Sequence, residues 1–490
     1  MQLTEGSDSP LHPGPLDTVI RNAAVVDGSG GPRFHADVAI HRGKIHSIGV
    51  GLAGRFQQEL DGAGQVLAPG FIDVHTHDDY AVISDRSNLC KISQGVTTVV
   101  TGNCGVSIAP LNIRYRPPPP LDLLSGDPDH FFATFEDYFK YLEDSPAAVN
   151  VAAQVGHSTL RVATMSDLQR PADAGEIKRM RRLLEDALRA GAIGMSTGLF
   201  YRTAQASTTQ EVIDVAKGMR ERGAIHTTHM RDEADAVAES LAETFRIGRE
   251  ADVPVIVSHH KCSGTRNFGR SIETLALIDA AARQQEVGFD VYPYCASSSV
   301  LDVEKFRDAT RIVVSWSIPH PEAAGRDLAE LAAEHGLSQK AMADRLQPAG
   351  GIYFMMDEVD VSRILAHPQS MIGSDGLPGD THPHPRLWGT FPRVLGHYSR
   401  ELNLFPLEAA VRKMTSLSAR QFNLSNRGLV RPGYQADLVL FDPLTVKDLA
   451  TFDHPVRHSA GIHLVMVNGA AVYQDGAATG AFPGQVLRRS

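Results

Sequence analysis

Two histidines spaced two residues apart, His75 and His77 in the run GFIDVHTHDD, form the first pattern in this sequence that suits a metal ion. On an extended backbone, residues i and i+2 point to the same side, so both imidazoles can bind one cation. An isolated HxH is more often a pair of unrelated surface histidines. Here the pair follows the run FIDV, so we expect it to be buried at the end of a strand.

Two further histidines end apolar runs later in the chain. His229 stands in HTTHMRDE and His259 in SHHK. Each has a neighbour, His226 and His260 respectively, that competes for the role. The two-residue period of a strand favours His229 and His259, which stand where the strands give way to loops.

A cysteine and an aspartate extend this set of donors. Cys104 lies in TGNCG and Asp375 in IGSDG. A lone cysteine is more often a small core residue, and an aspartate followed by glycine is common in turns. Together with the histidines, however, the two residues provide the N, S and O ligands that Zn²⁺ binds. The candidate ligands are His75, His77, Cys104, His229, His259 and Asp375.

Such a donor set points to hydrolysis. A bound zinc ion acidifies water and polarises a carbonyl group. A nearby carboxylate can take the proton from the water and pass it to a leaving amine, first as general base and then as general acid. The sequence therefore predicts metal-assisted hydrolysis.

The elements that must position these groups are eight short apolar runs, which alternate with helical patterns from about residue 69 to 424. Alternation of this kind indicates βα units, and eight strands predict an α/β fold of the (β/α)8 barrel type. Polar or titratable residues follow all eight runs, and in a barrel these carboxyl ends converge on the active-site face. The predicted strands are 71–74, 97–101, 149–154, 192–195, 224–227, 253–257, 287–291 and 371–373, and the clearest helix is 175–191.

Other segments lie outside this catalytic barrel of residues 69–424. Residues 17–68 and 425–490 read as short strands separated by turns, so we expect one small β-sandwich domain built from both chain ends. Residues 1–16 are polar and rich in Pro, Gly and Ser, which predicts a flexible leader. Residues 298–351 are too long for a simple connection between strands seven and eight. We interpret them as an inserted lid-like subdomain with a helical stretch over 327–346; a loop region that makes an oligomer contact is the alternative.

Composition argues against several other classes of protein. The 490 residues carry 47 Lys+Arg and 57 Asp+Glu, a net charge of -10, which does not suit binding to nucleic acid or anionic lipid. No apolar stretch of about 18 residues could span a membrane. The four cysteines form no CxxC pair and the N-terminus lacks a signal-peptide pattern, which suits a reducing cytoplasm. We expect a cytoplasmic monomer or small homo-oligomer that acts on a small molecule, without nucleic-acid or membrane partners.

The motifs GFIDVHTHDD, TGNCG, GMSTGLFY, THMRDE, SHHK, VYPY and GSDG occur in this order. With the predicted barrel and split β domain, they resemble the amidohydrolase superfamily and, within it, the N-acyl-D-amino acid deacylases (D-aminoacylases). The resemblance extends from about residue 18 to 473. It implies zinc-dependent hydrolysis of N-acyl-D-amino acids, for example N-acetyl-D-Met or N-acetyl-D-Leu, to a carboxylate and a free D-amino acid.

The same resemblance implies roles for individual residues. The tight zinc would be bound by Cys104, His229 and His259. A second, weaker metal position would be lined by His75, His77 and Asp375, with Asp375 as the proton shuttle. The α-carboxylate of the substrate would be bound by Lys261, Tyr292, Ser298 and Arg386, and in this run of three serines Ser297 or Ser299 is an alternative to Ser298. His157, which follows the third strand, is a further candidate for the substrate pocket.

Two alternative functions are retained. A cyclic-amide hydrolase of the same superfamily, dihydropyrimidinase-like or dihydroorotase-like, would be expected to carry a bridging lysine, and Cys104 argues against it. A non-catalytic binding protein on the same barrel would not need the complete ligand set. The preference for the D isomer comes from the resemblance alone. We find no surplus Lys or Arg near the motifs beyond Lys261 and Arg386, which favours a neutral or apolar substrate side chain.

Overall fold

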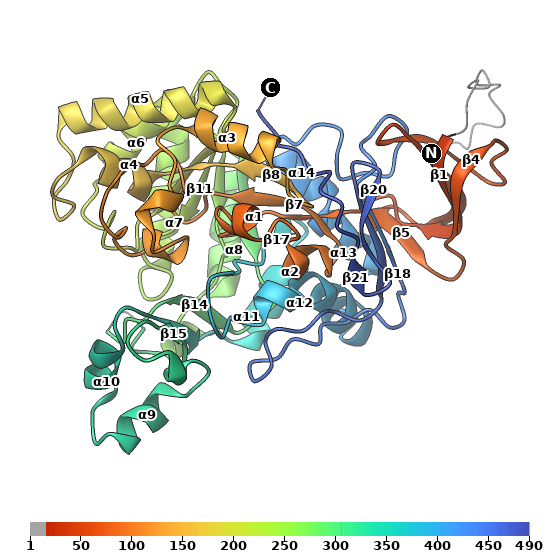
Figure 1. Cartoon of the computed structure of the whole chain (residues 1–490). Coiled ribbons are helices and arrows are strands. Elements are labelled where there is room, and N and C mark those ends of the chain that lie inside the picture. The colour runs from red at the N-terminus through yellow and green to blue at the C-terminus, as the bar shows by residue number, and fades with distance from the viewer. Residues whose placement is uncertain (1–15, 305, 490) are drawn as a thin grey trace.

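A computed structural model describes residues 16–304 and 306–489, and its centre is a barrel of eight parallel strands (Figure 1). All eight predicted strands are present, with ends that differ by no more than three residues. The third strand is interrupted at Gln154, and its second part, β9 (Val155–Gly156), pairs with the fourth strand. The eight strands are β6 (Phe71–Asp73), β7 (Val96–Thr101), β8 (Asn150–Ala153), β10 (Gly194–Gly198), β11 (Ile225–His229), β12 (Val255–Val257), β13 (Val287–Val291) and β17 (Ser370–Ile372).

The strands pair with their neighbours in chain order. Parallel ladders join β6 to β7 and β7 to β8, and a second series runs from β9 through β10, β11, β12 and β13 to β17. A parallel bridge between Thr76 and Gly376 connects the segments that follow β6 and β17. This bridge closes the ring, so the carboxyl ends of the first and eighth strands lie side by side.

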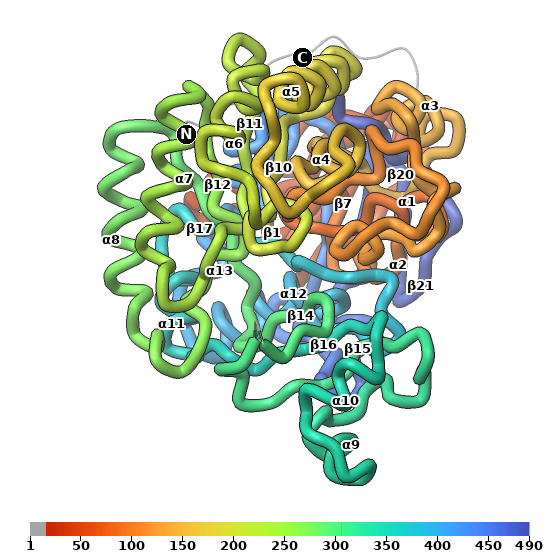
Figure 2. Tube along the Cα trace, turned by 90° about the vertical axis from the view of Figure 1, so that its left-hand side faces the viewer, coloured from red at the N-terminus to blue at the C-terminus, as the bar shows by residue number. Residues whose placement is uncertain are grey.

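Helices between the strands cover the outside of the barrel (Figure 2). The predicted helix 175–191 is confirmed as α5 (Ala174–Ala190), because Asp173 and Glu176 form a capping box and Gly191 ends the helix with φ of 108°. The other α-helices outside the segment between β13 and β17, together with α11 within it, are α1 (Ala81–Ser84), α2 (Leu89–Ile92), α3 (Phe135–Asp144), α4 (His157–Thr164), α6 (Thr209–Ala216), α7 (Val237–Ala251), α8 (Ser271–Ala282), α11 (Glu358–Ala366), α12 (Arg386–Arg393), α13 (Leu407–Met414) and α14 (Ser416–Gln421).

Strands from both chain ends form one nine-stranded sheet beside the barrel. The link between the two ends is the antiparallel ladder of β5 with β18. The strands are β1 (Leu16–Val25), β2 (Phe34–His41), β3 (Lys44–Gly49), β4 (Phe56–Asp61), β5 (Val66–Pro69), β18 (Leu438–Phe441), β19 (Ile462–Val467), β20 (Ala470–Gln474) and β21 (Ala477–Ala478).

The two faces of this sheet serve different cores. Leu438 and Leu440 pack into a small core of their own domain, whereas Val439 and Phe441 belong to the large core that includes the barrel. This division follows from the two-residue period of a strand. The last described residues leave the domain, because the backbone of Gln485 and Leu487 bonds to Val151 in β8. The segment predicted as 425–490 therefore ends against the barrel.

The segment between β13 and β17 forms a separate small subdomain, which projects from the barrel in both views (Figures 1 and 2). Its antiparallel sheet has the order β14-β16-β15 and spans residues 296–354, slightly more than the predicted 298–351. The helical stretch predicted over 327–346 is two helices rather than one. The elements are β14 (Ala296–Val300), β15 (Arg311–Ser317), α9 (Leu328–Glu334), α10 (Gln339–Leu346) and β16 (Ala349–Phe354).

Two predictions concern the chain ends and membranes. Apart from Leu16, which begins β1, the predicted leader 1–16 lies outside the described residues. Within the described part of the chain, no helix has the length and apolar character needed to cross a membrane.

Candidate metal centre

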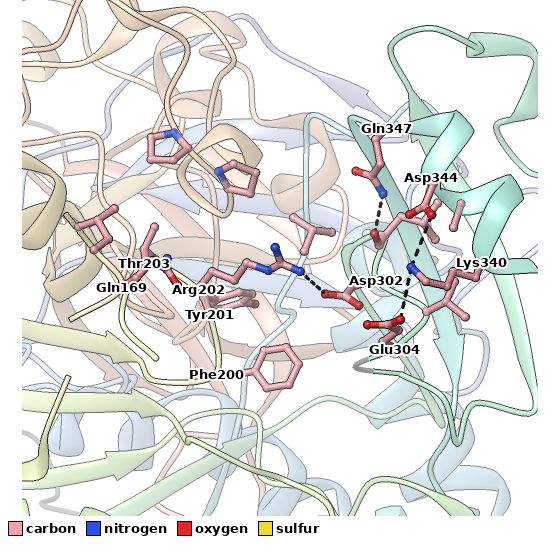
Figure 3. A pocket seen from close by; sticks show the side chains of 17 residues that line it. Gln169, Phe200, Tyr201, Arg202, Thr203, Asp302, Glu304, Lys340, Asp344 and Gln347 are labelled. Carbon is pink, nitrogen blue, oxygen red and sulfur yellow. Dashed lines mark hydrogen bonds and ion pairs between the residues drawn. The ribbon is translucent and has the colours of Figure 1, made fainter. Parts of the chain in front are cut away.

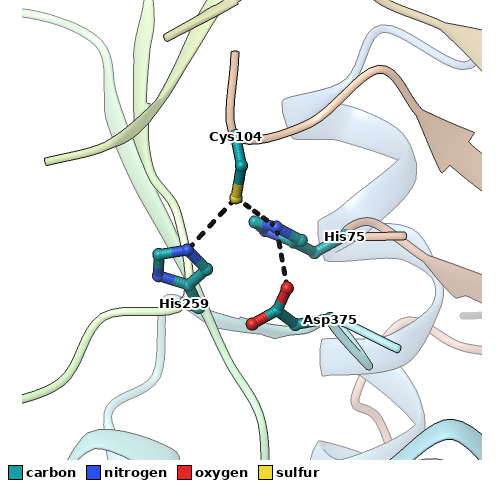
Figure 4. A group of neighbouring side chains, drawn as sticks. All are labelled: His75, Cys104, His259 and Asp375. Carbon is teal, nitrogen blue, oxygen red and sulfur yellow. Dashed lines mark hydrogen bonds and ion pairs between the residues drawn. The ribbon is translucent and has the colours of Figure 1, made fainter. Parts of the chain in front are cut away.

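The six predicted ligands meet in one buried cluster at the carboxyl ends of the strands. Figure 4 shows four of them, His75, Cys104, His259 and Asp375, whose donor atoms all lie within 4.8 Å of one another. Sγ of Cys104 lies 3.2 Å from Nε2 of His75 and 3.3 Å from Nε2 of His259. Nε2 of His75 lies 3.5 Å from Oδ1 of Asp375. The structure thus brings together residues from strands one, two, six and eight.

The other two predicted ligands border this group. Nδ1 of His229 lies 3.0 Å from Nε2 of His259, and Nε2 of His77 lies 3.2 Å from Oδ1 of Asp375. His229, Glu233 and His259 form a second group whose donors converge. Because His259 belongs to both groups, the two groups form one continuous cluster. Its donor atoms could be divided between two metal positions in more than one way.

Backbone conformation directs three of these side chains inward. Cys104, His259 and Asp375 have φ of 51°, 37° and 50°, in the left-handed region that residues other than glycine rarely adopt. Such conformations cost about 1–3 kcal/mol each and persist where the surrounding structure imposes them. The backbone around the cluster is also closely packed. A residue with a side chain could not replace Gly373, because its Cβ would lie 2.4 Å from Cβ of His75. The glycines in the TGNCG and IGSDG motifs accordingly stand in tight turns.

The thiol of Cys104 is polarised by its neighbours. Burial raises its pKa, but the imidazoles of His75 and His259 outweigh burial and hold the pKa well below the usual range of a thiol. The opposite holds for His259, where burial and Lys261 lower the pKa but Glu233 and Cys104 raise it to about 8. A thiolate that is stabilised by positive charge is the form of cysteine that binds metals.

Asp375 is held between histidines and an arginine. Its Oδ2 lies 2.8 Å from Nη1 of Arg386, a fully buried guanidinium. Burial raises the pKa of Asp375, but Arg386 and the neighbouring imidazoles lower it well below the ordinary value. The carboxylate is therefore ionised at neutral pH and can accept a proton from a water molecule beside it.

Three of the predicted carboxylate-binding residues, Lys261, Tyr292 and Ser298, line the pocket at the metal cluster, whereas Arg386 is fully buried beside it. Lys261 donates to both oxygens of Glu233 at 2.8 Å, while Arg386 donates to the backbone oxygen of Ser298 at 3.3 Å. The ring of Tyr292 lies between these cations, 5.6 Å from Nζ of Lys261 and 4.5 Å from Cζ of Arg386. The hydroxyls of Tyr292 and Ser298 are buried without a hydrogen-bond partner among the described residues. Both hydroxyls are thus available to a ligand in the pocket.

Two carboxylates at this site were not singled out from the sequence. Glu233, in the motif THMRDE, has its Oε1 3.0 Å from Nδ1 of His259. Burial raises the pKa of Glu233, but nearby positive groups, Lys261 above all, lower it well below its usual value. Asp290 accepts from the backbone N–H of His259 at 2.9 Å and lies 3.4 Å from Nδ1 of His75. Acids in this position orient metal-binding imidazoles. A lone carboxylate inside the buried run VGFDV was the available signal for Asp290.

His157, a predicted pocket residue, lies away from the metal cluster. The third strand ends before it, and His157 begins α4, where its Nε2 lies 3.5 Å from Oε1 of Glu211. Glu211 also pairs with the buried Arg161. His157 does not line the pocket at the metal cluster, so we do not assign it to substrate binding.

The histidines that competed with His229 and His259 also face away from the cluster. Nε2 of His226 lies 3.0 Å from the hydroxyl of Thr197, and Nε2 of His260 lies 2.8 Å from that of Thr274. Burial lowers the pKa of His226 to about 3 and that of His260 to about 4. Both imidazoles are therefore neutral parts of the barrel wall.

The rest of the pocket is largely apolar. Phe200 stacks on the ring of His229 at a centroid distance of 5.3 Å, and the ring of Tyr201 lies tilted against it at 5.0 Å. Lys261 is the one Lys or Arg among the described residues that line this pocket. Further apolar lining comes from Leu123, Phe306, Met355 and Leu377.

The residues of the cluster fit a zinc ion. They offer imidazole nitrogen, thiolate sulfur and carboxylate oxygen, which are the donors that zinc takes in proteins. Their polar atoms converge on one point in a buried site, and Glu233 and Asp290 supply the outer partners that hold metal-binding imidazoles. Several titratable groups are buried in contact with one another here, and a bound cation would compensate the cost of burying their charges.

Comparison with known proteins gives a consistent result. A family model described as "Amidohydrolase family" matches residues 58–473. The chain is 54% identical to a D-aminoacylase of Alcaligenes xylosoxydans xylosoxydans, over 97% of this chain and 98% of the relative. It is 51% identical to an N-acyl-D-aspartate deacylase of the same organism, over 99% and 97% of the two chains.

Solved structures show the same similarity. A D-aminoacylase studied for its binuclear metal centre is 55% identical, with a TM-score of 0.95 over 97% of this chain and 100% of that chain. An N-acyl-D-glutamate deacylase of Bordetella bronchiseptica, solved with zinc and a phosphonate inhibitor, is 46% identical, with a TM-score of 0.94 over the same shares. A dihydropyrimidinase of Brevibacillus agri is 16% identical with a TM-score of 0.61 over 96% of this chain and 98% of that chain, which shows a shared fold.

Proposed function

Because this chain belongs to the amidohydrolase family, and within it to the N-acyl-D-amino acid deacylases, we propose that it hydrolyses the amide bond of N-acyl-D-amino acids. The products are a carboxylate and a free D-amino acid. The observation that carries the proposal is the buried cluster of one cysteine, four histidines and one aspartate beside two cationic side chains. Donors for a metal that would polarise the amide thus lie beside cations that could bind a carboxylate.

The metal in this proposal is zinc, with Cys104, His229 and His259 as the ligands of a tight site. His75, His77 and Asp375 form the second, weaker position. When bound, zinc supplies a Lewis acid for the amide carbonyl and acidifies water. Support comes from the contacts of His259 with both Cys104 and His229 and from the zinc in the related glutamate deacylase.

Asp375 is the proposed proton carrier. Its lowered pKa keeps the carboxylate ionised at neutral pH, so its oxygens are free of protons and can accept one from the attacking water. The same carboxyl group then donates this proton to the nitrogen of the leaving amino acid, so one residue serves both halves of the reaction. His77, 3.2 Å from Oδ1, and Arg386, 2.8 Å from Oδ2, hold the carboxylate in place.

The α-carboxylate of the substrate is proposed to bind Lys261, Tyr292, Ser298 and Arg386. A guanidinium and an ammonium bind carboxylates through charge-assisted hydrogen bonds, and the free hydroxyls of Tyr292 and Ser298 add donors. With the carboxylate and the amide both fixed, only one configuration at the α-carbon directs the side chain into a given pocket. The D preference is taken from the related deacylases.

We propose neutral or apolar D-amino acids as the products. The aromatic and aliphatic lining around Phe200, Phe306 and Met355 favours an uncharged side chain. An acidic side chain would need its own cation, and the described lining offers Lys261 alone, which is already assigned to the α-carboxylate.

An assay with zinc-loaded protein tests this proposal. N-acetyl-D-leucine and N-acetyl-D-methionine are expected to be hydrolysed, with their L isomers, N-acetyl-D-aspartate and N-acetyl-D-glutamate as comparisons. Hydantoin and dihydroorotate test the cyclic-amide alternative, which is supported here only by a shared fold. Turnover of ring amides without activity on open-chain substrates would exclude the deacylase function.

Localisation and assembly are further proposals. All four cysteines have free thiols, which suits a reducing compartment, so we propose that the enzyme acts in the cytoplasm as a monomer or small homo-oligomer.

A further inference from the structure

A second, wider cleft adjoins the metal pocket, between the barrel loops and the inserted subdomain (Figure 3). Its volume is about 490 Å³, within the usual range for small-molecule sites. Phe200 and Tyr201 line both this cleft and the metal pocket. The two spaces therefore meet at these aromatic side chains, next to His229.

The cleft has two walls, and one of them lies across the barrel mouth from most of the carboxylate-binding residues. Lys261, Tyr292 and Arg386 follow β12, β13 and β17, whereas this barrel wall comes from segments after β7, β9 and β10, including Pro118 and Leu168. In a closed eight-stranded barrel, these two groups of strands are on opposite sides. The other wall is the inserted subdomain, which follows β13 and extends over the mouth.

The arrangement of an N-acyl amino acid determines which part faces the cleft. Its carboxylate and its acyl group lie on opposite sides of the scissile amide. When the carboxylate is held beside β12, β13 and β17 and the amide is at the metal cluster, the acyl group must point toward the segments after β7, β9 and β10. That direction leads past Tyr201 into the cleft.

The lining of the cleft suits an apolar chain. Leu168, Val300, Leu301, Val303 and Ala343 contribute aliphatic surface. The charged groups at the rim lie in opposite-charge pairs: Arg202 is 3.9 Å from Asp302, and Lys340 is 3.3 Å from Glu304 (Figure 3). The lining carries more carboxylates than cations, because Asp302, Glu304 and Asp344 face Arg202 and Lys340, and this balance does not favour an anionic ligand. The aliphatic surface, in contrast, gains from burial of methylene groups.

We propose that this cleft binds the acyl chain of the substrate and that the enzyme prefers linear apolar acyl groups longer than acetyl. The inference rests on the proposed deacylase function and adds the acyl class of its substrate. It assigns the inserted subdomain a part in acyl recognition, because Val300 to Val303 and Ala343 belong to that subdomain.

A series of N-acetyl-, N-butyryl- and N-hexanoyl-D-leucine tests the proposal on the full-length, zinc-loaded enzyme. We expect kcat/KM to rise by about twofold per added methylene, on the order of tenfold from acetyl to hexanoyl, since each buried methylene adds to binding.

Two variants narrow the cleft from opposite walls. Val303→Trp acts from the inserted subdomain and Leu168→Trp from the barrel side. Each is expected to lower the ratio of kcat/KM for hexanoyl to that for acetyl substrate by about fivefold to tenfold. Val359→Trp is the matched control, because Val359 is 59% exposed on α11 and lines neither space.

The possible results distinguish the acyl-cleft proposal from the deacylase function. An acetyl substrate that is hydrolysed as well as or better than hexanoyl would overturn the acyl-cleft proposal, as would a hexanoyl-to-acetyl ratio that neither narrowing variant changes. A change in preference among D-amino acid side chains, with the ratio unchanged, would show that the cleft holds the side chain and would also overturn it. Failure to hydrolyse any N-acyl-D-amino acid would overturn the deacylase function itself.

Discussion

The buried histidines of the barrel form two sets with different neighbours. The mouth set has carboxylates and a thiol within contact distance and comprises His75, His77, His229 and His259. The wall set is represented by His226 and His260, whose Nε2 atoms contact threonine hydroxyls. Burial, together with the neighbouring His157, lowers the pKa of His226 to about 3, whereas Asp375 and Cys104 outweigh burial and raise the pKa of His77 to about 9. At His229 burial still lowers the pKa, although Glu233 and Cys104 oppose it. The environment of a buried histidine, rather than burial itself, therefore marks the candidate metal site.

The largest effect is expected when the shared thiol of the mouth set is removed. Cys104→Ala should weaken zinc binding by more than about 100-fold, beyond the ~10–100-fold typical of outer partners, and activity at equimolar zinc should be lost. Metal content after dialysis and initial rates measure both. Cys90→Ala is the control, since burial raises the pKa of Cys90 to about 12 and keeps it a neutral thiol. A Cys104→Ala enzyme with full zinc and full activity would contradict the ligand assignment.

The second-largest effect is expected for Asp375, whose replacement should lower kcat without loss of the tightly bound zinc. Asp375→Asn should retain one zinc per chain but lower kcat by about 10²–10⁴-fold, the usual contribution of general acid–base catalysis. Zinc stoichiometry and kcat at saturating N-acetyl-D-leucine are the measurements. Turnover near the wild-type value would assign proton transfer to another group.

An outer member of the mouth set should have a smaller effect. Glu233→Gln removes the charge beside His259 and Lys261 and should weaken zinc binding by about 10–100-fold, with kcat at saturating zinc reduced less. Competition with a zinc chelator measures the affinity. Glu239→Gln on the exposed side of α7 is the control. Equal zinc affinity in both variants would show that Glu233 does not orient the ligand.

The wall set should affect stability rather than activity. His226 has a pKa of about 3 in the folded protein, whereas the ordinary value is about 6.5. Between these values the unfolded chain binds more protons, so acid destabilises the fold, by about 1 kcal/mol between pH 6.5 and 5.5. His226→Gln should remove that part of the pH dependence.

Urea unfolding of wild type and His226→Gln at pH 7.5, 6.5 and 5.5 measures this difference, and the exposed His35→Gln is the control. If the free energy of unfolding changes with pH by the same amount in wild type and His226→Gln, His226 takes up no proton on unfolding in this range.

The sequence was sufficient to predict the barrel and most of the cluster, because both follow local rules. Short apolar runs gave the eight strands, and the residue after each run, such as His75 or Asp375, lies at the barrel mouth. The two-residue period also separated His229 from His226, which lie on opposite sides of β11.

What could not be predicted depends on distant partners. Asp290 contacts His75 only because β13 and β6 are brought together by barrel closure. His157 was placed at the pocket because the third strand was read as continuous, but α4 begins at His157 and turns it toward Glu211. The wide cleft is likewise formed by segments from different parts of the chain, whose packing has no signature in any one of them.

The pairing of β5 with β18 has a consequence for synthesis on the ribosome. Val66 to Pro69 emerge early, but their partners Leu438 to Phe441 emerge only after the whole barrel has been made. Until then one edge of β5 is unpaired, and exposed strand edges promote association between chains. A nascent chain that stalls before Leu438 would therefore depend on chaperones in a way that the finished enzyme does not.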